Sequence, residues 1–313
     1  MKRFSALLFF NLFSFNLLSS FGFSPGETGY NFLKLGIGAR PVAMGSAFTA
    51  VADDAHSIFW NPGGIGLYPK FDATLMIMNL FTSVTYGSLG MKIPLGRNFG
   101  LGIGGALLSA QDTKRDPTGE EIGEYYFNNF LFVSGFSLRP FTNFSLGFSL
   151  KGIATRLDTF FSYSLALDGG MLYSFNKNLF FGAGLFHLGT PQNFIKEKNI
   201  LPTSIRLGSA YKIPILIHQL LFASDIVFYI DNKPIFSLGG ELKLKDLPQK
   251  SNELALRAGY QTGYHLGTWK GISLGIGYSQ KIAQRVFLTI DATYFDYGYV
   301  GSSERVSVSL KFD

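Results

Sequence analysis

The chain has 313 residues, of which 47% are hydrophobic, 16% aromatic and only 15% charged, and its formal net charge is +6. A typical soluble domain is about 25% charged, and a chain this apolar is not disordered, because burial of its side chains can offset the entropy lost on ordering. It contains no cysteine, which excludes a disulfide framework, a thiolate zinc site and an iron–sulfur cluster.

The first 22 residues have the layout of a secretory signal peptide. Lys2 and Arg3 form a short positive region, an apolar stretch covers residues 7–18, and small residues follow up to Gly22. The stretch is shorter than the roughly 20 apolar residues that a membrane-spanning helix needs. We therefore expect residues 1–22 to be a signal peptide that is removed after export; the alternative is an N-terminal anchor helix.

Residues 23–70 are rich in glycine and small side chains and are expected to form a compact segment. Asp53 or Asp54 is expected to cap a short helix that runs through Phe59. The residue before Pro62 is disfavoured in helical geometry, so this helix should end there. Asp53 and Asp54 are also expected to pair with Arg40. The length of the segment suits a plug inside a barrel.

Beyond this segment, apolar and polar residues alternate, which predicts β-strands with one apolar face. In residues 306–312, for example, every even position is apolar and every odd position is polar. A soluble sandwich would bury the apolar face and show charge to water, whereas a membrane barrel turns it to lipid. Here the second face holds small residues with isolated charges, which favours the membrane barrel. The isolated charges are Asp168, Arg206, Asp225, Glu241, Arg257 and Asp291.

The segments predict about fourteen strands, within a range of 12 to 16. Their expected starts are near Phe71, Ser83, Phe99, Glu124, Asn143, Phe160, Asn178, Thr203, Gln219, Pro234, Asn252, Gly271, Arg285 and Glu304. The fold class is thus all-β: a transmembrane antiparallel β-barrel over residues 71–313, with an N-terminal hatch over residues 23–70.

The connections support this topology because short and long ones mostly alternate; residues 245–251, a longer connection on the short-turn side, are the exception. Short turns are expected at one end of the barrel, as at residues 94–98 and 139–143, and longer polar loops at the other, as at residues 111–123 and 262–270. Aromatic residues near strand ends, among them Phe295 and Tyr297, are expected to form interfacial girdles.

The sequence gives little support for a nucleotide, metal, catalytic or nucleic-acid site. Residues 100–105 match a glycine-rich dinucleotide pattern, but strand rather than helix follows. Asp53, Asp54 and His56 could form a metal cluster, but a helix cap and an ion pair with Arg40 are the favoured interpretation, and the four histidines show no metal-ligand spacing. His187 is the nearest candidate for a hydrolase histidine, without a recognisable serine partner. The positive charges are scattered rather than gathered in a stripe, so nucleic acid is not expected as a partner. We expect no enzyme activity, no metal and no cofactor.

The segment from residue 38 to residue 64 resembles the opening motif of the PorV/PorQ-like outer-membrane proteins, which are distant relatives of the FadL-type channels for hydrophobic molecules. The resemblance implies a fourteen-stranded barrel with an N-terminal hatch, whose Asn61-Pro62 turn lies in the lumen. It also implies a set of hatch and lumen residues as binding candidates. These are Arg40, Met44, Gly45, Phe48, Asp53, Asp54, Phe59, Trp60, Asn61 and Pro62.

Two functions follow as hypotheses for a protein in the outer membrane of a Gram-negative-type bacterium, in contact with its lipid. In the first, the barrel binds or passes a hydrophobic small molecule through the hatch-plugged lumen, which predicts an apolar pocket beside Phe48, Phe59 and Trp60. In the second, the barrel is a PorV-like anchoring or shuttle component of a type IX secretion-like system, and its extracellular rim binds exported proteins.

Overall fold

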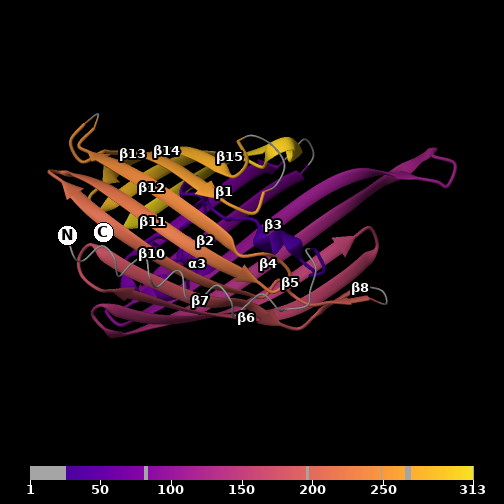
Figure 1. The fold of residues 1–313 in the computed structure, drawn as a ribbon, viewed down its shortest axis with the longest axis horizontal. Helices are drawn as coiled ribbons and strands as arrows, with labels where there is room; N and C mark the ends of the chain where they lie inside the picture. The colour runs from indigo at the N-terminus through magenta and orange to yellow at the C-terminus, as the bar shows by residue number, and fades with distance from the viewer. Residues whose placement is uncertain (1–25, 81–83, 195–196, 248, 265–268, 313) are drawn as a thin grey trace.

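The computed structural model describes residues 26–80, 84–194, 197–247, 249–264 and 269–312. Fourteen antiparallel strands close into a barrel, in which β1 pairs with both β2 and β16 (Figure 1). This confirms the predicted fold class and strand number. The predicted signal peptide lies outside the described residues.

The barrel strands follow the expected positions closely, and the largest difference is at β4, which was expected near Glu124 and begins at Glu121. The barrel strands are β1 (Phe71–Leu80), β2 (Val84–Leu95), β3 (Phe99–Arg115), β4 (Glu121–Phe141), β5 (Phe144–Leu157), β6 (Phe160–Ser174), β7 (Leu179–Gly189), β10 (Ser204–Ile215), β11 (His218–Tyr229), β12 (Ile235–Lys245), β13 (Glu253–Gln261), β14 (Ile272–Ala283), β15 (Val286–Asp296) and β16 (Ser302–Phe312). A separate pair is formed by β8 (Gln192–Phe194) and β9 (Glu197–Asn199), and the helical turns are η1 (Asn31–Lys34), α2 (Ala39–Ala43), α3 (Ser57–Trp60), α4 (Gly63–Leu67) and η2 (Gly298–Val300).

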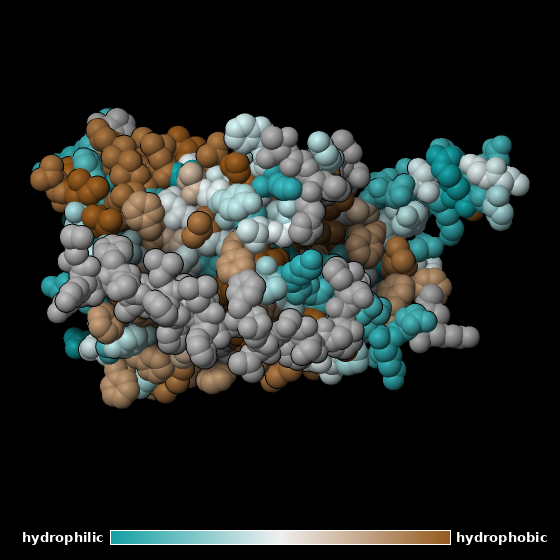
Figure 2. Space-filling view, viewed as in Figure 1, coloured by the Kyte–Doolittle hydropathy of each residue, from teal (hydrophilic) through white to brown (hydrophobic). Residues whose placement is uncertain are grey.

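The apolar face of the strands points out of the barrel. On β16, Val308 is 39% exposed whereas the adjacent Ser307 is fully buried. Brown, hydrophobic side chains accordingly cover much of the barrel wall (Figure 2). An apolar exterior around a small and polar interior is the arrangement of a membrane-spanning barrel, because lipid rather than a second sheet covers the outer face. No helix among the described residues is both long and apolar enough to cross a bilayer.

The two ends of the barrel differ. The end at which β1 begins and β16 ends, here called the near end, carries short turns such as residues 96–98, 142–143 and 284–285. The opposite, far end carries most of the longer connections, as predicted, and residues 246–252 at the near end are the expected exception. The β3–β4 hairpin projects beyond the barrel there, at the right of Figure 1, and is mostly teal, hence hydrophilic, in Figure 2.

The prediction of a loop over residues 111–123 was wrong, because the two strands continue to pair through most of it. Gln111 lies opposite Tyr126, and pairing reaches Arg115 and Glu121. The turn itself is closed by the Asp116 carboxylate, which accepts hydrogen bonds from the backbone N–H groups of residues 118 and 120. Backbone pairing that continues past the barrel rim keeps a polar segment ordered without a hydrophobic core.

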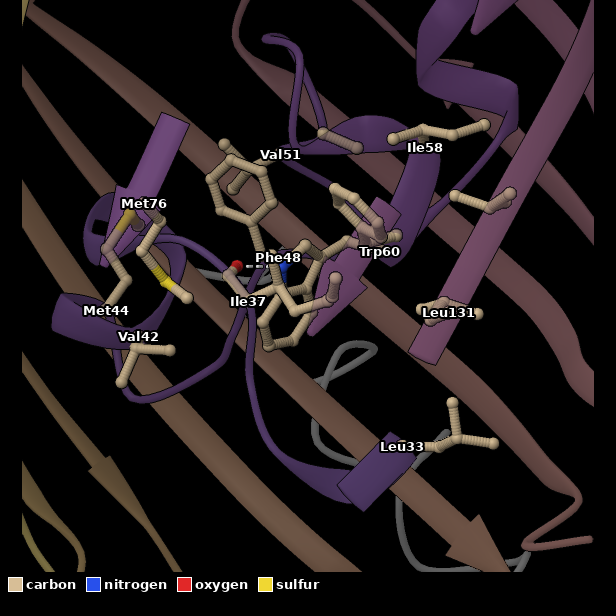
Figure 3. Close-up of a cluster of buried hydrophobic side chains, with 14 of the residues drawn as sticks. Leu33, Ile37, Val42, Met44, Phe48, Val51, Ile58, Trp60, Met76 and Leu131 are labelled. Atoms are coloured by element: carbon tan, nitrogen blue, oxygen red, sulfur yellow. Dashed lines mark hydrogen bonds between the residues drawn. The ribbon is translucent and has the colours of Figure 1, made fainter. Parts of the chain in front are cut away.

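Residues 26–70 fill the lumen and form its core. Their apolar side chains pack with inward-facing residues of the wall, such as Met76 and Leu131 (Figure 3). The wall makes room for them with glycines on its inner face. Gly102 and Gly104, from the glycine-rich run of β3, lie against the side chains of Ile58 and Phe59, where an added Cβ would be 2.8 and 2.7 Å from the nearest atom. That run therefore serves packing within a strand rather than phosphate binding.

Candidate functional site

The hatch helix begins later than predicted. Asp54 was a candidate N-cap, but α3 starts at Ser57, and Asp54 instead forms a turn in which its carboxylate accepts the His56 N–H at 3.0 Å. The helix includes Trp60 and ends at Asn61, whose extended backbone (φ −163°, ψ 103°) agrees with the expected effect of Pro62. The carboxylate stabilises the turn that leads into the helix rather than the helix terminus itself.

Arg40 is the centre of a buried ion-pair network that joins the hatch to the wall. Its guanidinium contacts Asp53 at 2.5 Å and Asp54 at 2.7 Å, which is the ion pair expected from the sequence. It also makes a two-pronged contact with Glu241 on β12, with Nε–Oε2 at 2.8 Å and Nη2–Oε1 at 3.0 Å. Arg257 on β13 contacts Glu241 at 2.7 Å and Asp291 on β15 at 2.7 Å, so it extends the network along the wall. Removing one partner from such a buried network typically costs about 3–5 kcal/mol, because it leaves an uncompensated charge.

The network shifts the protonation equilibria of its hatch members. Burial alone would raise the pKa of Asp53 and of Asp54, but the charge of Arg40 on the first, and of His56 and Arg40 on the second, outweighs it. The pKa of both carboxyls is therefore below the ordinary range. The pKa of Arg40 is raised further, because its carboxylate partners outweigh its burial. All three groups are held in their charged forms.

The Asn61-Pro62 turn packs against the inner face of the barrel wall. The Asn61 amide nitrogen donates to the backbone carbonyls of Thr49 at 2.8 Å and of Met171 on β6 at 2.9 Å, and its carbonyl accepts the Gly63 N–H at 3.0 Å. Gly170 makes the approach possible, because a Cβ there would lie 2.3 Å from the Asn61 side-chain oxygen. Every polar atom of this buried amide side chain is thus engaged in fastening the hatch.

Met44 and Gly45 form a second close contact between the hatch and the wall. Gly45 has a left-handed backbone (φ +60°) that L side chains rarely adopt, and a Cβ on it would lie 2.5 Å from the carbonyl oxygen of Leu238. On the wall, Gly239 and Gly259 face the Met44–Gly45 backbone at equally short range. Glycine is therefore required on both sides, since backbone meets backbone here.

The next hatch segment, residues 48–49, is hydrogen-bonded to a carboxylate of the barrel wall. One oxygen of Asp225 on β11 accepts the N–H groups of Phe48 at 3.0 Å and of Thr49 at 2.8 Å. The Phe48 ring is fully buried and meets the Trp60 ring edge to face, with centroids 6.1 Å apart. Trp60 in turn donates its indole N–H to the Ile37 carbonyl at 2.7 Å, the dashed bond in Figure 3. Phe48 is consequently a structural part of the hatch.

A cavity of about 60 Å³ lies in the far half of the lumen, between hatch and wall. Phe59 and Trp60 line it, as the small-molecule hypothesis predicted; Phe48 does not. It is not purely apolar. The wall contributes aromatic and charged residues that include Tyr86, Tyr264, Phe295, Lys151, His187, Arg206, Asp225 and Arg305.

The cavity presents several hydrogen-bonding atoms that have no partner within the described residues. They are the Tyr86 hydroxyl, His187 Nε2, Arg206 Nε, Arg305 Nε and Asp225 Oδ1. His187 Nδ1 lies 3.2 Å from the Lys151 ammonium and can only accept from it, so Nε2 carries the proton. Four of the five atoms are then donors. A buried polar atom left unpaired costs about 1–3 kcal/mol, so this cavity favours contents that accept hydrogen bonds.

Aromatic rings close the cavity on one side. Tyr264, Phe295 and Tyr297 pack with centroid separations of 4.7 to 5.5 Å. The prediction that Phe295 and Tyr297 belong to an interfacial girdle was wrong, because Phe295 is 1% exposed and points into the lumen. It has the inward parity of β15, which it shares with Asp291, so the alternation of the strand already contained this signal.

The ten candidate residues from the sequence thus divide into two groups. Phe59 and Trp60 border the cavity, and the other eight fasten the hatch through ion pairs, hydrogen bonds or close backbone packing. Arg206 and Asp225 are recognisable from the sequence only as inward charges, and their position at the cavity is not. Inward parity shows which residues face the lumen, but it does not give their height or their partners.

Comparisons with known proteins agree on the fold. No family model matches the chain, and neither does any curated protein. Among solved structures, it is similar to the Pseudomonas putida toluene transporter TodX, with a TM-score of 0.58 and 12% identity over 88% of this chain and 97% of that one. It is also similar to the Ralstonia pickettii toluene transporter TbuX (0.58, 11%, 88% and 97%) and to a Pseudomonas aeruginosa FadL homologue (0.55, 11%, 85% and 96%). The chain has the fold of the FadL-type barrels.

Proposed function

We propose that this protein is an outer-membrane barrel that binds or passes a hydrophobic small molecule through its hatch-plugged lumen, without enzyme activity. The proposal places it in a Gram-negative-type outer membrane after cleavage of a signal peptide over residues 1–22. Residues 23–70 serve as the hatch and residues 71–313 as the barrel. The near end then faces the periplasm and the far end the exterior.

The cavity beside Phe59 and Trp60 carries this proposal. At about 60 Å³ it exceeds the roughly 10–15 Å³ that one water needs, yet it is smaller than the roughly 150 Å³ of an engineered cavity that holds benzene. A ligand therefore requires side chains or hatch to move. The similarity to proteins named as toluene transporters supports an apolar cargo.

The donors around the cavity refine the substrate class. Arg206 lies over the rings of Trp60 and Phe186, at 5.4 and 4.5 Å from their centroids, so its charge is held among aromatic surfaces. An apolar molecule that carries a hydrogen-bond acceptor would pair the free donors and bury its body against the rings. We propose such a molecule in preference to a pure hydrocarbon.

Trp60 offers a direct test. The chain has two tryptophans, and Trp269→Phe removes the exposed one, so that the remaining emission comes from the cavity. Toluene, benzyl alcohol and benzoate form a size-matched series that differs in the acceptor. We expect a saturable change in emission, with the two oxygen-bearing compounds binding tighter than toluene. No saturable response to any of them would refute the proposed site, and tighter toluene binding would refute only the role of the donors.

The PorV/PorQ-like alternative has one specific observation in its favour. The β3–β4 hairpin extends beyond the barrel and exposes apolar side chains on a polar background, with Ile122 57% and Tyr126 47% exposed. Such a surface can hold an exported protein. Native mass spectrometry of gently purified protein separates the two functions. A retained small hydrophobic molecule supports a channel, whereas a co-purifying exported protein that is lost when residues 112–124 are shortened supports an anchor.

A further inference from the structure

An apolar groove of about 580 Å³ is cut into the outer face of the barrel wall. It arises because β5 turns two small residues outward between large residues of its neighbours. The register places Ala154 between Phe130 and Tyr163, and Gly152 between Phe132 and Leu165. The four large side chains are 44% to 69% exposed. A Cβ on Gly152 would meet nothing within 4 Å, so the groove floor is open.

A positive charge stands at the far end of this groove. Arg156 is the next outward residue on β5, between Asn128 and Phe161 in the register. Its guanidinium carbon lies 5.5 Å from the centroid of the Phe161 ring, and its Nε donates to the Asp158 carbonyl at 2.9 Å. Its two terminal nitrogens have no hydrogen-bond partner in the described part of the chain.

Nearby charges leave the site with a net charge of about one positive unit. The Asp158 carboxylate pairs with Lys114 at 3.1 Å, and both side chains are exposed. Asp158 and Lys114 therefore compensate one another, while Arg156 keeps its charge. A guanidinium with free terminal N–H groups matches the oxygens of a phosphate in a two-pronged geometry.

We propose that this groove binds lipid A, the lipid of the exterior leaflet, with one acyl chain against Gly152 and Ala154 and a phosphate on Arg156. The groove lies on the surface that faces lipid, so an acyl chain is what covers it. The charge stands at the far end, close to where the membrane interface is expected, and aromatic side chains such as Tyr163 and Phe161 are typical of that level. The net positive charge complements the negative charge of a lipid A phosphate. The choice of lipid rests on the proposed location of the far end at the exterior, but not on the function of the lumen.

The chain offers a matched pair of variants. Gly152→Leu fills the groove. Gly240→Leu, on β12, is the control, because it is also an outward glycine whose added Cβ would approach no atom closer than 4.0 Å. Arg156→Gln removes the charge and leaves the groove. None of these residues contacts the hatch or the luminal cavity.

Native mass spectrometry of the purified protein, titrated with lipid A in detergent, tests the proposal. We expect Gly152→Leu to lose one retained lipid that the parent and Gly240→Leu keep. Arg156→Gln should weaken retention about ten-fold, since hydrogen bonds to a charged group are lost, but should not change retention of lipid A from which both phosphates have been removed. Equal retention in Gly152→Leu and the parent would overturn the groove, and an unchanged Arg156→Gln would overturn the phosphate contact. Stronger retention of dioleoylphosphatidylglycerol than of lipid A would overturn the choice of lipid.

Discussion

Asn61→Ala tests whether the Asn61-Pro62 turn locks the hatch. The substitution removes three hydrogen bonds, to the Thr49 and Met171 carbonyls and from the Gly63 N–H. At about 1 kcal/mol each, the loss is about 3 kcal/mol of hatch stability. Two of these bonds lie within the hatch and one reaches the wall, so all three are lost only when the hatch unfolds locally. Because about 1.4 kcal/mol corresponds to a ten-fold change in an equilibrium constant, this locally unfolded, open form of the hatch should become about 100-fold more populated.

A buried thiol reports this opening. The chain has no cysteine, so Ser57→Cys introduces the only one. Ser57 is fully buried in the hatch, and its hydroxyl has no hydrogen-bond partner within the described residues, so sulfur replaces it at little cost. The rate of alkylation by iodoacetamide then follows the population of open hatch, provided that opening and closing are fast relative to alkylation.

The comparison is made between Ser57→Cys alone and the same protein with Asn61→Ala. Asn193→Ala serves as the matched control, because Asn193 is an exposed asparagine on β8. We expect about 100-fold faster labelling with Asn61→Ala, no change with Asn193→Ala, and an intact barrel by heat-dependent electrophoretic mobility. A labelling rate within two-fold of the parent, in a folded barrel, would refute the proposed lock.

Three further predictions use the same assay. Glu241→Gln leaves two buried arginines without their shared carboxylate, which should weaken the hatch by roughly 3 kcal/mol and speed labelling accordingly. The lowered pKa values of Asp53 and Asp54 mean that their contribution is complete above the ordinary carboxyl pKa of about 4 and is lost as the pH falls through the lower folded values. The labelling rate, divided at each pH by that of an exposed cysteine because only the thiolate reacts, should therefore not rise from about pH 7 to pH 5 and should rise only below about pH 4; a rise near neutrality would contradict this. Gly170→Ala should loosen the hatch, because its methyl group would overlap the Asn61 side chain, whereas Gly152→Ala adds a methyl to open space and should be silent.

Strand positions were predictable because their signal is local. Alternation with a period of two depends only on which face of a strand meets lipid, so the strand starts could be read from neighbouring residues alone. The same alternation correctly assigned charges such as Glu241 and Arg257 to the interior. The β3–β4 connection differs from the predicted loop because its polar composition is typical of loops, whereas the backbone pairing that orders it carries no compositional signal.

The hatch illustrates the opposite case. Residues 23–70 could be recognised from the amino-acid sequence as a small-residue segment with an ion pair between Arg40 and Asp53 or Asp54, since these residues are close along the chain. Which wall residues complete that segment depends on the closed barrel. Glu241 and Met171 lie more than a hundred positions away, and their contacts depend on how fourteen strands close around the hatch, which fixes both the rotation and the height of each inward side chain. The wall glycines that contact the hatch could be predicted from the sequence as inward small residues. The hatch residue that packs against each of them depends on how the barrel closes.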